Sequence, residues 1–195
     1  MNSGKQKPAK MKYFLTSVLL IFCININAQI TETVATVTNE RQFLLPYNRL
    51  VQPAGHQIIF GDDSRENHSM DLAISTDGKW LAVEERFSIV FISTNDNNVK
   101  FTLLNNMHPD LRAGRNTYSG ILWDTDNEIV KVYWSVVGNN NRSFVVSAVW
   151  DGEKAVFDRI FEYKPDPYAE VAIPNEILIS TEFRKKYLYV VLNGN

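Results

Sequence analysis

The sequence contains few residues of the kinds that carry thiol or metal chemistry. Its only cysteine, Cys23, lies inside an apolar stretch near the N-terminus. Once that stretch is cleaved as a signal, the remaining chain holds no thiol, which excludes disulfides, thiol catalysis and cysteine-ligated metals. The three histidines, His56, His68 and His108, are far apart and form neither a His-x-His nor a His-Glu-x-x-His pattern. The sequence therefore predicts no histidine metal site.

Motifs of common catalytic and phosphate-binding sites are also missing. The chain has no glycine-rich phosphate loop, no Gly-x-Ser-x-Gly elbow and no Ser/His/Asp spacing typical of a triad. Two acidic stretches, 62–71 and 124–128, could attract a cation, but neither has the ligand spacing and the glycine of a calcium loop. We interpret both as polar turns, and we expect no catalytic residue, no cofactor and no bound metal.

The chain lacks an excess of basic residues. It has 20 lysines and arginines against 22 acidic residues, a formal net charge of -2. Four of the lysines lie within residues 1–28, which hold no acid, so the rest of the chain carries -6. Because binding to phosphates needs a basic surface, this balance argues against nucleic acid as a partner.

The N-terminus has the layout of a secretory signal. Lysines over residues 5–12 are followed by an apolar stretch at 13–24, and the small residue Ala28 precedes a cleavage site. The apolar stretch is shorter than a membrane span, although an uncleaved anchor is an alternative. We therefore expect a secreted or periplasmic protein with no membrane span after removal of residues 1–28.

The segment 71–83 has the pattern of a strand, a tight turn and a second strand. Leu72 and Ile74 alternate with Asp71 and Ala73, which is the period of a half-buried strand. The turn 76–79 contains Asp-Gly, a pair that tolerates the positive φ angles of a tight hairpin. Weaker copies follow further along the chain, the last with a longer turn at 181–186.

Spacing between the copies predicts the architecture. Ile74, Leu122 and Ile179 occupy matching positions, 48 and 57 residues apart. A period near 50 built from four short strands is typical of a β-propeller blade, with a plain antiparallel sandwich as the alternative. The sequence thus predicts an all-β fold, a partial β-propeller of about two and a half four-stranded antiparallel blades. The expected order is a signal peptide at 1–28, a lead-in at 29–55, and an incomplete propeller at 56–195 with blades at about 68–104, 118–163 and 174–195.

Two stretches carry a resemblance to a known repeat. Residues 73–83 are similar to the "SPDG-K-aromatic-L" hairpin of YVTN-type, YncE-like β-propellers. Residues 174–180 and 187–195 resemble the "PN-ILIS…YLYV-N-G-N" form of the same blade. The resemblance covers roughly 56–195, and because such propellers usually have seven blades, it implies a truncated copy.

The whole chain also resembles the N-terminal part of secreted proteins in which such a propeller precedes an alkaline-phosphatase-like phosphoesterase domain. In that family the metal-binding and nucleophilic residues lie in the C-terminal domain, and nothing in this sequence matches them. The resemblance therefore implies that phosphoesterase activity would require a domain absent from this chain.

Apolar residues occupy both faces of the second predicted blade. Val130, Val132 and Trp134 share one face, and Ile129 and Tyr133 share the other. Blades bury their faces against neighbours, so an incomplete stack leaves one face uncovered. We expect self-association through that face.

Loops at one end of the predicted blades form the candidate binding rim. In a four-stranded blade, the loop between the second and third strands shares an end with the connections between blades, here 84–87, 137–142 and the long loop 105–119. Loops on a rigid scaffold are where binding sites arise, although solvated loops without function are the alternative. The candidate rim residues are Glu85, Arg86, His108, Arg112, Arg115, Asn140 and Arg142.

These patterns favour a non-catalytic, secreted β-propeller segment that acts as a binding or scaffold module, with an unknown ligand or protein on the rim. The alternative is the N-terminal fragment of a bifunctional propeller and alkaline-phosphatase-family phosphoesterase whose catalytic domain is absent. A complete hydrolase that uses rim carboxylates such as Glu85 is the third hypothesis.

Overall fold

The computed structural model describes most of the chain after residue 35. The described residues are 36–39, 42–45, 49–62, 64–139, 142–164 and 172–193. The predicted signal peptide at 1–28 and the rim residue Asn140 lie outside them. The chain divides into two compact units between Gln57 and Ile58.

The first unit contains a small antiparallel sheet within the predicted lead-in. Its strands are β1 (Thr36–Asn39), β2 (Gln42–Leu45) and β3 (Arg49–Val51), paired in that order. All three residues of β3 are exposed.

The second unit begins with a four-stranded antiparallel meander, here called sheet 1. Its strands pair in chain order: β4 (Ser69–Ile74), β5 (Trp80–Glu85), β6 (Ser88–Ser93) and β7 (Val99–Leu104). The Asp77-Gly78 turn joins β4 to β5, with Gly78 at a φ of 73° that glycine adopts without strain. Every residue of β6 is buried, as its run of branched and aromatic residues predicts for an inner strand.

The alternation in β4 has the opposite sense to the one that hydrophobicity suggests. Leu72 and Ile74 share a face, but each is 59% exposed, whereas Ala73 on the other face packs against the core. The indole Nε1 of Trp123 donates to the Ala73 carbonyl at 2.9 Å. The small Ala73 side chain allows the neighbouring sheet to approach β4 closely on that face, leaving the larger pair outside.

A five-stranded sheet, here called sheet 2, follows. Two short 3₁₀ helices lead into it, η2 (Asn105–Met107) and η3 (Pro109–Leu111). Its strands are β8 (Arg115–Asn116), β9 (Leu122–Asp126), β10 (Ile129–Val137), β11 (Ser143–Trp150) and β12 (Ala155–Tyr163). Strands β12, β11 and β10 pair in that order, and β8 and β9 both pair with the remaining edge of β10.

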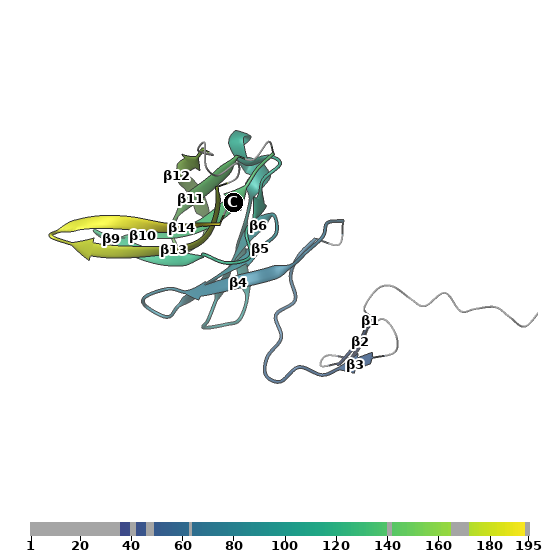
Figure 1. Cartoon of the computed structure of the whole chain (residues 1–195). Coiled ribbons are helices and arrows are strands. Elements are labelled where there is room, and N and C mark those ends of the chain that lie inside the picture. The colour runs from purple at the N-terminus through teal and green to yellow at the C-terminus, as the bar shows by residue number, and fades with distance from the viewer. Residues whose placement is uncertain are drawn as a thin grey trace, which may run out of the picture. The chain divides into compact units, whose positions relative to one another are not determined.

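The chain continues as a long hairpin of β13 (Ile173–Glu182) and β14 (Lys185–Asn193). Its turn has only two residues, Phe183 and Arg184, with φ angles of 47° and 66°. The prediction of a longer turn was wrong, because both residues adopt the left-handed conformation that a two-residue hairpin loop needs. Strand β13 contacts β9, β10 and β11, and Figure 1 shows the hairpin running alongside β9 and β10.

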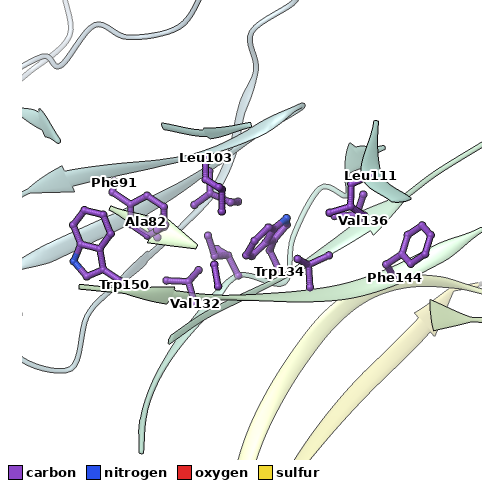
Figure 2. Close-up of a cluster of buried hydrophobic side chains, with 14 residues drawn as sticks. Ala82, Phe91, Leu103, Leu111, Val132, Trp134, Val136, Phe144 and Trp150 are labelled. Carbon is purple, nitrogen blue, oxygen red and sulfur yellow. The ribbon is translucent and has the colours of Figure 1, made fainter. Parts of the chain in front are cut away.

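The main core lies between sheets 1 and 2. Strand β4 of sheet 1 contacts β9 of sheet 2, and strand β7 contacts β12. The strand at each edge of sheet 1 therefore lies against a strand at the corresponding edge of the β9–β12 meander. The Phe91 ring stacks on Trp150 with centroids 4.4 Å apart, and Trp134 is completely buried (Figure 2). Interlocking aromatic rings of this kind contribute strongly to packing energy.

The structure confirms the predicted all-β, antiparallel fold, and no described sheet closes on itself. The expected uncovered face lies elsewhere than predicted, because β13 packs over β10 and β11. The outer face of the hairpin carries exposed apolar residues of its own, among them Leu178 at 62% and Val191 at 60% exposure.

Candidate functional site

Backbone hydrogen bonds tie the long connection after β7 to the β5–β6 turn. The Asn105 N–H donates to the Phe87 carbonyl at 2.9 Å, and the Asn116 N–H donates to the Arg86 carbonyl at 2.8 Å. The buried Asn116 side chain adds to these bonds, because its Nδ2 donates to the carbonyls of Glu85 and Ser88 at 2.5 and 3.0 Å. The β5–β6 turn is thereby fixed against the connection.

The β10–β11 loop joins the same assembly. The Gly138 N–H donates to the Arg142 carbonyl at 2.7 Å, which closes the described part of the loop. The Arg142 Nη2 lies 3.7 Å from Asp110 Oδ1 in η3. Three loops that are distant in sequence therefore meet at one end of sheets 1 and 2. We call the described part of this region the rim: residues 85–88, 105–116, 137–139 and 142.

A pocket of about 200 Å³ opens between η3 and the β10–β11 loop, and we call it the arginine pocket. Its lining includes Asp110, Arg112, Gly114, Gly138, Arg142 and Phe144. Its apolar floor and its charged wall come from different elements, because Phe144 belongs to β11 and Asp110 to η3. The Arg142 guanidinium carbon lies 4.9 Å from the Phe144 ring centroid, within the range of a cation–π contact.

Arg142 is held in place by an acidic partner across sheet 2. Its Nε and Nη2 donate to the two carboxylate oxygens of Glu162 at 2.8 and 3.2 Å. This bidentate pairing raises the pKa of Arg142 and lowers the pKa of Glu162. The remaining nitrogen, Nη1, has no partner among the described residues.

The other predicted rim residues have diverse surroundings. Glu85 is only 5% exposed and accepts from the Ser88 hydroxyl at 2.8 Å. Arg86 forms an ion pair with Glu66 at 2.9 Å. The His108 Nδ1 accepts from the Asp110 N–H at 3.3 Å, and its ring lies 5.4 Å from that of Phe157, which indicates a packing and capping role.

Two of the predicted cations have no acidic partner in the described part of the chain. Arg112 lines the arginine pocket, and Arg115 is exposed in β8. Neither forms an ion pair with any described residue. They are therefore the rim cations that remain available to a partner.

Glu84 was predicted to lie with Glu85 on the rim loop, but it faces the core. Strand β5 extends through Glu85, so the two neighbouring side chains point to opposite faces of sheet 1. Glu84 is completely buried, and neither carboxyl oxygen has a hydrogen-bond partner among the described residues. Burial, assisted by the charges of Asp71 and Glu176, raises the pKa of Glu84 to about 9.

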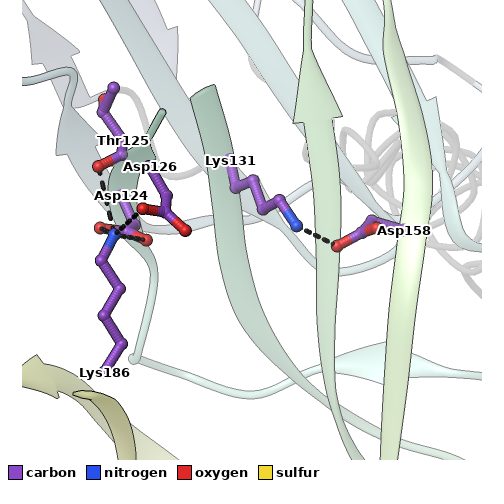
Figure 3. Close-up of polar contacts among 6 residues, drawn as sticks. All are labelled: Asp124, Thr125, Asp126, Lys131, Asp158 and Lys186. Carbon is purple, nitrogen blue, oxygen red and sulfur yellow. Dashed lines mark hydrogen bonds and ion pairs between the residues drawn. The ribbon is translucent and has the colours of Figure 1, made fainter. Parts of the chain in front are cut away.

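Acids in both acidic stretches form ion pairs with cations of this chain. Asp62 accepts from the Ser64 N–H and hydroxyl, which together with Arg65 lowers its pKa. Figure 3 shows the Lys186 ammonium between Asp124 and Asp126, at 2.8 and 3.6 Å. Within the described ranges, no three His, Cys, Asp or Glu side chains come close enough together to hold a metal ion.

The partners of the rim arginines were not found from the sequence. Glu66 and Glu162 are each about 20 residues from the arginines that they bind, and no motif links them. Asp110 carries a local signal, since it follows Pro109 at the start of a 3₁₀ turn.

Comparison with known proteins identifies no family. No family model matches the chain, and no curated protein matches it. One solved chain, from a complex of the fission yeast SREBP–SCAP binding domains, aligns with a TM-score of 0.36 and 11% sequence identity. The alignment covers 98% of this chain and 55% of that one, and a similarity of this size supports no conclusion about fold or function. No helix in the described ranges has the length and hydropathy to cross a membrane.

Proposed function

We propose that this chain is a non-catalytic, exported binding module whose rim recognises a carboxylate of a partner protein. The observation that carries the proposal is Arg112, an arginine that lines the arginine pocket and has no ion-pair partner among the described residues. Guanidinium groups match carboxylates geometrically, and an arginine that the protein itself leaves unpaired is ready to do so.

One cation of the pocket lacks an ion-pair partner. Two arginines and two acids balance here, but both acids, Glu162 and Asp110, pair with Arg142, and Arg112 pairs with no described residue. The bidentate bond to Glu162 also fixes the orientation of Arg142, whose Nη1 is left for a second hydrogen bond. A carboxylate in this pocket would bridge the unpaired guanidinium of Arg112 and the fixed one of Arg142.

The packing of the sheets supports a propeller-type scaffold for this rim. Strands β4 and β9 open their meanders and contact each other, while β7 and β12 close them and contact each other. Neighbouring propeller blades stack in this order, with inner strands on inner strands and outer strands on outer strands. The β13–β14 hairpin would be the start of a third blade on sheet 2.

Fluorescence polarisation with labelled peptides tests the carboxylate proposal. The peptides come in pairs that are identical except at one position, where one member has Glu and the other has Gln. Each pair is titrated with the purified chain and with the Arg112→Glu variant. Because a charge-assisted hydrogen bond contributes about 1.5–3 kcal/mol, we expect Arg112→Glu to weaken binding of Glu peptides at least about tenfold.

Arg184→Glu is the matched control. It makes the same charge change in the exposed turn between β13 and β14, two residues before Lys186, which pairs with Asp124. Equal losses in both variants would indicate a general effect of net charge and would refute the rim proposal. Equal binding of the Glu and Gln peptides would refute the carboxylate.

A further inference from the structure

A second pocket of about 200 Å³ lies on the face of sheet 1 that points away from sheet 2. We call it the acidic pocket. Residues Gly61, Asp62, Glu66 and Asn67 line one side, and residues of β5, β6 and β7 line the other. Its lining also includes Glu85, Phe87, Ser88 and Leu104.

Two of the three acids in this pocket have cations of their own. Asp62 lies 3.4 Å from Arg65, and Glu66 pairs with Arg86 at 2.9 Å. Glu85 has none, although it is the most buried of the three, with 5% of its surface exposed. The pocket therefore carries one carboxylate whose charge nothing in the described chain offsets.

The hydrogen bonding of Glu85 is also incomplete. Its Oε2 accepts from the Ser88 hydroxyl at 2.8 Å, while its Oε1 makes no hydrogen bond or ion pair with any described residue. A carboxylate that lines a cavity and has no cation of its own is positioned for a cation from outside.

We propose that the acidic pocket binds one alkylammonium group, a lysine side chain or a small amine, through an ion pair with Glu85. The aromatic ring of Phe87 and the aliphatic atoms of Leu104 lie in the same lining and would pack against the methylene stem. The volume is below the 300–1,000 Å³ typical of sites for drug-sized ligands, so about one side chain fits. A divalent metal fits less well, because no three metal-ligating side chains converge within the described ranges.

The experiment compares a charged probe with its neutral isostere on the whole chain. Nα-acetyl-lysine amide and Nα-acetyl-norleucine amide have stems of similar shape, but only the first carries an ammonium. We expect the lysine probe to shift the backbone amide resonances of Gly61, Asn67 and Phe87 in two-dimensional ¹⁵N spectra, and the norleucine probe to leave them in place. Similar shifts with both probes would overturn the proposal, and so would the absence of shifts with both the lysine probe and butylammonium.

The Glu85→Gln variant supplies the second arm. Glutamine keeps an acceptor for the Ser88 hydroxyl and removes the charge, so we expect affinity for the lysine probe to fall at least tenfold. Glu153→Gln, in the exposed β11–β12 turn, is the matched control and should bind as the wild type does. Undiminished binding by Glu85→Gln would overturn the proposal, and if that variant does not fold, the probe comparison on the wild type still decides.

A third probe distinguishes the two sources of the ammonium. Butylammonium has the same charged end without a peptide backbone. Binding of both probes indicates a pocket open to a lysine side chain of a partner, whereas binding of butylammonium alone indicates a free amine. Arg112→Glu, which changes the arginine pocket, should leave the affinities for the lysine probe and for butylammonium unchanged. The two proposals are therefore tested independently.

Discussion

Glu84 makes the stability of the protein depend on pH in a direction that can be measured. The carboxyl is completely buried on β5, has no hydrogen-bond partner among the described residues, and lies near the charges of Asp71 and Glu176. Its pKa is therefore raised from 4.5 to about 9 in the folded protein. The folded state keeps the proton over a range of pH in which the unfolded chain releases it.

The sign of the effect follows from the protons bound in each state. Below pH 4.5 the carboxyl is protonated in both states, and its contribution to stability is fully present. Between pH 4.5 and about 9 the folded state holds more protons than the unfolded state, so stability falls by about 1.4 kcal/mol per pH unit. From pH 5.5 to 8.0 the loss from this group is about 3 kcal/mol.

The assay is urea unfolding of the wild type and of Glu84→Gln, followed by circular dichroism at several values of pH between 5.5 and 8.0. Glutamine has nearly the same shape and cannot ionise, so we expect the free energy of unfolding of the variant to be flatter with pH by about 3 kcal/mol over that range. Other titrating groups are common to both proteins and cancel in the difference.

Glu153→Gln is the control, because that exposed side chain lies in a turn and its removal should leave the pH profile parallel to the wild type. Parallel profiles for Glu84→Gln and the wild type would refute the reasoning. They would show that the carboxyl is solvated, or that it has a partner outside the described residues.

Two further predictions concern the rim and the hairpin. Asn116→Ala removes two hydrogen bonds from Asn116 to carbonyls at the ends of β5 and β6, and one that Asn116 accepts from Asn105. We therefore expect the free energy of unfolding, measured in urea, to fall by about 2–3 kcal/mol. Asn139→Ala, in the exposed β10–β11 loop, is the control, and an equal effect of the two substitutions would contradict this role. If the outer face of the hairpin drives self-association, Leu178→Ser with Val191→Thr should lower the average mass in sedimentation, whereas Val156→Thr on β12 should not. An unchanged mass distribution would exclude that face.

The strands and two of the tight turns follow from local sequence. The Asp77-Gly78 and Asp151-Gly152 pairs mark tight turns, and the structure places strand ends on both sides of each. Period-two patterns and turn residues act over a few positions, which is why they can be found without the tertiary structure.

The direction of side chains at strand ends could not be predicted in the same way. Glu84 and Glu85 are chemically alike and adjacent, yet one is in the core and the other lines a pocket. Because β5 continues through Glu85, the two side chains alternate between its faces, and the packing of sheet 2 on the face that carries Ala82 decides which of them is buried. Hydrophobicity gives no signal here, since both residues are charged.

The Arg142–Glu162 pair could not be predicted from the sequence because a β-bulge changes the pairing of β11 with β12. Strands β11 and β12 change register between Ser147 and Ala148, so that Phe144 stands opposite Glu162. Without that bulge, counting back from the Asp151-Gly152 turn would place Glu162 on the opposite face of the sheet from Arg142. The sequence around Ser147 contains no glycine or proline that would mark the irregularity.

The contact between Trp80 and Trp150 gives the molecule its own optical reporter. One indole belongs to β5 in sheet 1 and the other to β11 in sheet 2, with ring centroids 5.1 Å apart and planes at 72°. Indoles this close couple their electronic transitions, and the coupling disappears as soon as they separate. The near-ultraviolet dichroism of this pair should therefore register any parting of the two sheets while each sheet keeps its own hydrogen bonds.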